Sequence, residues 1–336
     1  MGFFRQNVAI DLGTDTILMY LENKGIVVNQ PSLVSVKKGT DTIVAIGDES
    51  KTMLGRVNPD TEVIRPVASG VVSHFTLTKK MISYYLNSNI TNFFHRILKP
   101  DVMVAVPLHT TEVEKRAVER VAQEAGCARV FMIEEPLAAA IGAGLNVENA
   151  YGHMIVDIGG GTTDVAVVSF QGVVSGKSIK VAGDSFDTAI MEYIKKQYGM
   201  MIGPLEAERI KKELACLYHG MVTNTMEIHG TDVIEGAYKE QTITSDELME
   251  TMMEVALPIL DCIHEVLGNT PPELAGDIYS RGILMTGNGS LIKGLAELIH
   301  RSTGIDVTIA ENPGLCVVNG AYKVLTTMSE QQKTNI

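Results

Sequence analysis

One strand-and-turn pattern occurs twice in this chain, about half a chain apart. Residues 8–16 read VAIDLGTDT, and residues 155–164 read IVDIGGGTTD. In each segment an apolar run reaches Asp, continues through one more apolar residue and then turns through Gly and Thr. Asp11 and Asp157 hold equivalent positions. The repeat therefore predicts two related α/β lobes that face each other.

The repeated turn has the chemistry of a phosphate site. Glycine lets backbone N–H groups approach phosphate oxygens, Thr hydroxyls donate further hydrogen bonds, and an Asp carboxylate can hold Mg²⁺, often through water. A single loop of this kind is most simply a tight connection. Two matching loops favour phosphate binding, with Asp11 and Asp157 as the candidate magnesium residues.

Composition narrows the class of protein. The 336 residues are 45% hydrophobic and carry a formal net charge of −12, which predicts two globular domains and disfavours nucleic-acid binding. No apolar stretch reaches the roughly 18 residues of a membrane-spanning helix, and the first residues lack the pattern of a signal peptide. The four cysteines form no CxxC pair, so we expect free thiols and a cytoplasmic location.

The rest of the sequence alternates strand and helix patterns. Residues 101–106 (DVMVAV) are typical of a strand buried on both faces, and a Thr111–Glu114 capping box begins a helix that Gly126 ends. We expect further strands at 130–133, 166–170, 173–179 and 282–286, and further helices at 137–144, 186–198, 206–217, 245–267, 291–303 and 316–328. The last helix should pack back onto the first lobe.

Two segments allow both a functional and a structural interpretation. Residues 172–178 (GVVSGKS) resemble a P-loop, but they have one residue too few between the glycines and no helix follows. We expect a hairpin turn there. A carboxylate of Glu134 or Glu135 could orient a water molecule, yet an acidic residue at a helix start is the simpler interpretation.

Three other patterns are similarly open. Glu208, Lys211 and Lys212 have the spacing of an exposed, ion-paired helix face. The eight histidines are dispersed along the chain, which predicts no zinc site. Residues 92–99 (NFFHRILK) mix apolar and cationic side chains, as does a core-facing helix end or a segment that inserts into a lipid surface.

These motifs, in this order, resemble the bacterial actin MreB family, including its Mbl-type and MreBH-type members, within the superfamily of actin, Hsp70 and the sugar kinases. The resemblance runs nearly from end to end. It is carried by IDLGT, NQPSLV, GRVNPDTEVIRP, TEVEKRAV, IEEPLAAAIGAGL, VDIGGGTTDVAVVS, AGDSFD, AERIKKE, TPPELAGDI, GILMTGNGSLIKGL and AENP.

The resemblance implies a duplicated, actin-like (ribonuclease H-like) α/β fold with ATP or ADP and Mg²⁺ in a cleft between two lobes. Lobe I would comprise residues 1–143 and 316–336, with a small subdomain at about 30–70. Lobe II would comprise residues 144–315, with a small subdomain at about 181–243. The implied nucleotide-binding residues are Asp11, Gly13, Thr14, Thr16, Asp157, Gly159, Gly160, Gly161, Thr162, Thr163, Glu208, Lys211, Lys212, Gly287, Asn288 and Gly289.

Individual roles follow from the same resemblance. Glu135 would be the catalytic carboxylate that orients water toward the γ-phosphate, with Thr162 assisting. Asp11 and Asp157 would place Mg²⁺ through water. Glu208 and Lys211 would contact the ribose, Lys212 would flank the adenine, and the turn at 287–289 would lie against the adenosine.

The implied function is that of a slow, magnesium-dependent ATPase of the bacterial cytoskeleton. Family members form filaments with themselves and with paralogous bacterial actins, attach to the inner face of the cell membrane by apolar insertion, and organise the cell-wall elongation machinery. The corresponding membrane residues are Phe93, Phe94, Ile97 and Leu98. Two alternatives stay open: a non-hydrolysing paralogue that co-polymerises, and a monomeric small-molecule kinase of the same superfamily.

The sequence departs from the family pattern at four positions. Asp15 and Thr16 replace Ala and Asn of the usual DLGTAN, and Asp15 adds a negative charge that would repel a polyphosphate unless it points outward or helps to bind the metal. Ser69 stands where Asp usually precedes Gly-Val. Asn288 replaces the middle Gly of a GGG turn, which would be strained if that position needs a positive φ.

Overall fold

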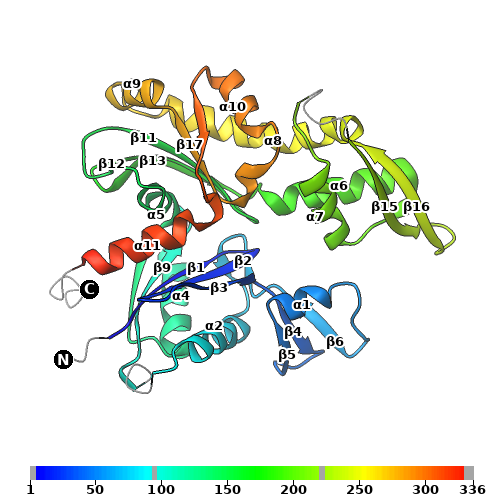
Figure 1. Ribbon diagram of the computed structural model, residues 1–336, viewed down its shortest axis with the longest axis horizontal. Coiled ribbons are helices and arrows are strands. Elements are labelled where there is room, and N and C mark those ends of the chain that lie inside the picture. The colour runs from blue at the N-terminus through cyan, green and yellow to red at the C-terminus, as the bar shows by residue number, and fades with distance from the viewer. Residues whose placement is uncertain (1–4, 93–96, 219–223, 329–336) are drawn as a thin grey trace.

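A computed structural model describes residues 5–92, 97–218 and 224–328 (Figure 1). Its first half is built on a five-stranded sheet with the order β10-β9-β1-β2-β3. In this sheet β1 runs antiparallel to β2 and parallel to β9. The strands are β1 (Asn7–Leu12), β2 (Thr16–Leu21), β3 (Gly25–Pro31), β9 (Asp101–Val106) and β10 (Arg129–Glu134).

The second half repeats this topology. Its sheet has the order β18-β17-β11-β12-β13, in which β11 runs antiparallel to β12 and parallel to β17. Asp11 and Asp157 are each the fifth residue of a six-residue central strand, which confirms the predicted duplication. The strands are β11 (His153–Ile158), β12 (Thr163–Ser169), β13 (Gly172–Ile179), β17 (Ile283–Thr286) and β18 (Val307–Ile309).

The apolar strand patterns match the burial of the sheets. All six residues of β9 are buried, as the sequence predicts for a strand covered on both faces. One face of the first sheet packs against α2 (Phe75–Asn89) and α4 (Glu112–Ala125). Helix α4 begins at the predicted capping box of Thr111 and Glu114, and Gly126 ends it in the left-handed conformation.

Two helices fill the space between the sheets (Figure 1). They are α5 (Glu135–Gly142) and α11 (Cys316–Thr327), and α11 also contacts β1 and β9, so the last helix packs onto the first half as predicted. A methyl group on Gly142 would lie 1.8 Å from the carbonyl oxygen of Cys316, and one on Gly320 would lie 1.8 Å from that of Ala138. The two helices therefore cross at backbone contact, which only glycine permits at these positions.

Smaller elements extend from each half on the same side of the molecule (Figure 1). In the first half these are β4 (Val34–Lys37), β5 (Ile43–Ile46), α1 (Asp48–Thr52) and β6 (Thr61–Ile64), followed by β7 (Val67–Ala68) and β8 (Val71–Val72). In the second half they are α6 (Gly183–Tyr198), β14 (Met200–Met201), α7 (Pro204–Glu213), β15 (Thr225–Asp232) and β16 (Tyr238–Thr244). The remaining elements of the second half are α8 (Ser245–Gly268), α9 (Pro272–Arg281), the 3₁₀ turns η1 (Asn288–Leu291) and η2 (Pro313–Leu315), and α10 (Leu295–Thr303).

Two local predictions were wrong. The hairpin of the strands expected at 166–170 and 173–179 does form, as β12 and β13, but residues 172–178 lie in β13 and are not the expected turn, because the chain reverses at Phe170 and Gln171, which both have positive φ. The helix expected over 291–303 is broken, because Ile292 is extended and Gly294 is left-handed between η1 and α10.

Among the described residues, every helix is too short or too polar to cross a lipid bilayer.

Candidate active site

A cavity of about 910 Å³ lies where the two Asp turns meet, a volume in the range of small-molecule sites. Nearly all of the predicted site residues line it: Asp11, Gly13, Thr14, Thr16, Glu135, Asp157, Gly159, Gly160, Gly161, Thr162, Glu208, Lys211, Lys212, Gly287, Asn288 and Gly289. Thr163 does not line it. Its side chain is fully buried in β12, and its hydroxyl donates to the carbonyl of Val181.

The two Gly/Thr turns touch each other at this cavity. A methyl group on Gly160 would lie 2.5 Å from Cβ of Asp15, and one on Gly161 would lie 2.7 Å from Oγ1 of Thr14. The Thr14 hydroxyl also accepts a hydrogen bond from the backbone N–H of Gly70. Glycine at 160 and 161 is therefore required for the close approach of the two turns.

The turn at 287–289 packs with similar closeness against the end of β11. Gly287 has a φ of 75°, and a methyl group there would lie 2.2 Å from the carbonyl oxygen of Ile158. Asn288 is not among the residues with positive φ. Its replacement of the usual Gly is therefore free of the backbone strain that the sequence left open.

Buried carboxyl groups dominate the electrostatics of the cavity. Burial raises the pKa of Asp157 to about 6, against an opposing hydrogen bond from Thr286. Burial, and then the charge of Asp157, raises the pKa of Asp11. Glu135 is the first residue of α5 and is only 8% exposed; burial, followed by the charges of Asp164, Asp11 and Asp157, raises its pKa well above the ordinary value.

This arrangement suits a hard divalent cation. Carboxylate oxygens are the ligands that Mg²⁺ prefers, and Asp11 and Asp157 present them from two different sheets to one cavity. Their charges repel each other in this buried setting, so a cation between them would be stabilising. The residues present therefore fit a magnesium ion.

Helix α7 supplies another part of the cavity wall. Glu208 accepts hydrogen bonds from Lys212 and, across the cavity, from Lys51 of α1 at 2.7 Å. Burial opposes its ionisation, but these two lysines hold its pKa at about 2. Lys211 is largely buried and donates to Asp187 and to the carbonyl of Gly183. Only Lys212 matches the solvent-exposed face that its spacing indicates.

Arg65 is a site residue that sequence reasoning missed. Its guanidinium donates to the carbonyl of Thr14 and lies 3.4 Å from carboxylate oxygens of both Asp15 and Asp184. It therefore ties the first Asp turn to the start of α6 in the other half. Arg65 stands in the GRVNPDTEVIRP motif, but no local pattern indicates which residues it contacts.

The predicted membrane residues are only partly described. Phe93 and Phe94 lie outside the described residues. Ile97 is 62% exposed, and Leu98 is partly buried.

Two equivalent sheets, the paired helices α5 and α11 between them and a cavity lined by both Asp turns define an actin-like fold. The protein-family model described as "MreB/Mbl protein" matches residues 5–333. The chain therefore belongs to the MreB/Mbl family.

Individual relatives match over nearly the whole chain. The cell shape-determining protein MreB of Escherichia coli (strain K12) is 43% identical over 328 residues, which cover 96% of this chain and 94% of the relative. The crystal structure of MreB5 of Spiroplasma citri bound to AMPPNP is 34% identical, with a TM-score of 0.93 and 99% of each chain covered. The ADP-bound structure of the same protein has a TM-score of 0.91, at 34% identity and with 99% of this chain and 98% of that chain covered.

Proposed function

We propose that this protein binds ATP and Mg²⁺ in the cavity and hydrolyses the γ-phosphate slowly, as a filament-forming protein of the bacterial cytoskeleton. One observation carries the proposal: both Asp-Gly-Thr turns meet at one cavity that also contains the buried carboxyl group of Glu135. The AMPPNP and ADP complexes of the Spiroplasma relative support the choice of nucleotide.

The two turns would bind the phosphates. Gly13 and Thr14 on one side and residues 159–162 on the other line the same space, where free backbone N–H groups and Thr hydroxyls of the turns would donate to phosphate oxygens. Asp11 and Asp157 would hold the metal through water. Bound magnesium would supply positive charge that offsets the phosphate charges and favours ionised carboxylates nearby.

Glu135 would orient the attacking water. It is the first residue of α5 and lines the cavity. Its raised pKa favours the protonated carboxyl group as long as no cation offsets the charges of Asp164, Asp11 and Asp157. In a neutralised site the carboxylate can accept a proton from water, and Thr162, which lines the same cavity, would assist.

We further propose that the nucleotide biases the hinge between two lobes, residues 1–143 with 316–336 and residues 144–315. Contacts from both turns to one γ-phosphate favour closure, and their loss after hydrolysis relaxes it. The closed form would assemble into filaments of this chain, alone or with paralogous bacterial actins. By analogy with the cell shape-determining relative, such filaments would organise cell-wall elongation at the membrane.

Attachment to the membrane would use apolar insertion near Ile97. This side chain is largely exposed, and the acidic chain would gain little from charge attraction to anionic lipids. Vesicle co-sedimentation of wild type and of the double variant Ile97→Ser/Leu98→Ser tests this part. Equal sedimentation of the two proteins would contradict it.

A paired comparison tests the catalytic proposal. Glu135→Ala should keep ATP affinity and slow phosphate release at least tenfold, which corresponds to about 1.4 kcal/mol of barrier. Glu134→Ala is the matched control, because Glu134 is the adjacent N-cap residue and makes no side-chain capping bond. Unchanged turnover in Glu135→Ala would remove this residue from the catalytic role.

Pelleting with Mg-ATP, with ADP and without nucleotide separates the alternatives. Pellets with phosphate release support a filament-forming ATPase. Pellets without phosphate release favour the non-hydrolysing paralogue. Phosphate transfer that requires an added small molecule, without pellets, would favour the kinase. Calorimetry that detects no adenine-nucleotide binding with excess magnesium would refute the whole proposal.

A further inference from the structure

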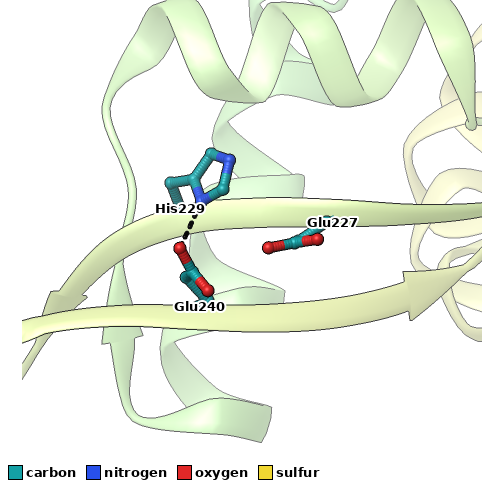
Figure 2. A group of neighbouring side chains, drawn as sticks. All are labelled: Glu227, His229 and Glu240. Atoms are coloured by element: carbon teal, nitrogen blue, oxygen red, sulfur yellow. Dashed lines mark ion pairs between the residues drawn. The ribbon is translucent and has the colours of Figure 1, made fainter.

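The hairpin of β15 and β16 brings together three metal-ligating side chains that are scattered in the sequence (Figure 2). Their ligand atoms all lie within 4.8 Å of one another. The residues are Glu227, His229 and Glu240. We propose that they form a site for a borderline transition-metal ion, of which Zn²⁺ is the clearest example, on the opposite side of α7 from the nucleotide cavity.

Strand register creates the cluster. His229 and Glu240 are direct partners in the antiparallel pair, and Glu227 lies two residues before His229 on the same face of β15. Nδ1 of His229 is 3.8 Å from Oε1 of Glu240, and the Glu227 carboxylate extends over the same face (Figure 2). A metal here would bridge the two strands of the hairpin.

The donor set selects the kind of metal. Imidazole nitrogen with carboxylate oxygens suits zinc and its first-row neighbours, whereas Mg²⁺ and Ca²⁺ prefer oxygen ligands alone. Zinc bonds of roughly 2.0–2.2 Å place ligands about 3.3–3.5 Å apart in a tetrahedron, so modest rotation of two exposed Glu side chains completes the geometry. Three protein ligands leave one position for water.

The surrounding charges favour a cation. Within the described ranges, neither Glu227 nor Glu240 forms an ion pair with a lysine or arginine. The nearest cations are already paired, Arg209 with Glu206 and Lys239 with Asp232. The cluster therefore carries net negative charge that no neighbouring side chain neutralises.

Helix α7 holds the backbone of the site in place. Glu206 accepts a hydrogen bond from the backbone N–H of His229 at 3.2 Å, and Arg209 donates to the carbonyl of Glu227 at 2.9 Å. These contacts fix the two ligand-bearing positions of β15, as outer contacts do in metal sites generally.

Tyr238 contacts two of the three proposed ligands through its hydroxyl group. Its hydroxyl donates to Glu240 at 2.7 Å and lies 3.0 Å from Nδ1 of His229. A metal must displace these two hydrogen bonds, so Tyr238→Phe removes the competitor and leaves all three ligands. This variant should bind the metal at least as tightly as wild type.

Competition between the full chain and a chelating dye for Zn²⁺, at pH 7.5 with excess Mg²⁺ to occupy the cleft carboxylates, tests the site. We expect one zinc equivalent whose affinity falls at least tenfold in His229→Gln and in Glu240→Gln. His264→Gln is the matched control, because it removes an imidazole that hydrogen-bonds Ser302 far from the hairpin.

A second measurement distinguishes a lost metal site from a misfolded variant. Zinc should raise the melting temperature of wild type, His264→Gln and Tyr238→Phe, but not of His229→Gln, while circular dichroism reports the same fold for all. Zinc affinity in His229→Gln equal to wild type, equal losses in the His264→Gln control, or complete suppression of zinc binding by Mg²⁺ would each overturn the proposal.

Discussion

Replacing Asp157 by asparagine should stabilise the ligand-free protein. Burial raises the pKa of Asp157 from 3.8 to about 6, although the hydrogen bond from Thr286 opposes this rise. The Thr286 hydroxyl donates to Oδ1 of Asp157 at 2.6 Å, and the Oδ1 of asparagine can accept the same bond. The substitution therefore removes the buried charge and keeps both the shape and this contact.

The magnitude follows from the pKa. A rise of about two pH units corresponds to roughly 3 kcal/mol of free energy that the ionised carboxylate costs the folded state. The folded state retains the proton to a higher pH than the unfolded chain does. Wild-type stability from this group is therefore fully present below about pH 4 and is lost as the pH rises to about 6 and beyond.

Asparagine does not titrate, so the variant should lack this loss. Its advantage over wild type should be small near pH 4 and approach about 3 kcal/mol above pH 7. The charge of Asp157 also raises the pKa of Asp11. Asp157→Asn removes this repulsion, which further stabilises the variant relative to wild type. In the presence of Mg-ATP the order should reverse, because the variant loses a carboxylate that we assign to the metal.

Urea unfolding followed by circular dichroism between pH 4 and pH 8, in EDTA and at low protein concentration, measures the difference. Asp261→Asn is the control, since Asp261 lies on the exposed face of α8. A free-energy difference between Asp157→Asn and wild type that stays constant with pH, or a variant less stable than wild type at pH 8, would refute the reasoning.

Two further predictions concern packing and charge. Gly142→Ala should destabilise the protein by about 1–3 kcal/mol in urea unfolding, because its methyl group would collide with the backbone of α11. The control is Gly276→Ala in α9, which should be neutral or slightly stabilising because no atom lies within 4 Å of the new methyl group. Equal effects of the two substitutions would contradict the close crossing of α5 and α11. Arg65→Ala should weaken ATP binding roughly fivefold in calorimetry, because it leaves Asp15 unpaired beside the phosphate turns, and adding Asp15→Ala should restore part of the affinity. If the double variant recovers no ATP affinity, the effect of Arg65 on binding does not depend on its ion pair with Asp15.

The fold was predictable because its central feature is local. An apolar strand that ends in Asp and turns through Gly and Thr can be recognised within ten residues. Its repetition implies that β1 and β11 pair with their neighbouring strands in the same way, β1 with β2 and β11 with β12. The errors arose where one backbone conformation decides the outcome. Residues 172–178 contain two glycines and a lysine, but the reversal is made by Phe170 and Gln171, whose side chains do not indicate a turn.

Contacts between distant segments were not predictable. Lys51 meets Glu208, and Arg65 meets Asp184, across more than a hundred residues of chain. The spacing of Glu208 and Lys212 did indicate their ion pair, but it did not indicate that Lys51 also pairs with Glu208. Likewise, His229 reads as an isolated histidine until the register of β15 and β16 places Glu240 beside it.

Asp15 shows why such contacts change the meaning of a substitution. Judged from the sequence, a carboxylate in place of alanine beside a polyphosphate costs binding energy. In the structure its Cβ packs against Gly160 and its carboxylate faces Arg65, which also contacts Thr14 and Asp184. The added negative charge is thus part of a bridge between the two halves. Because that bridge borders the cavity, Asp15 should influence how readily the cavity closes as well as how strongly it attracts phosphate.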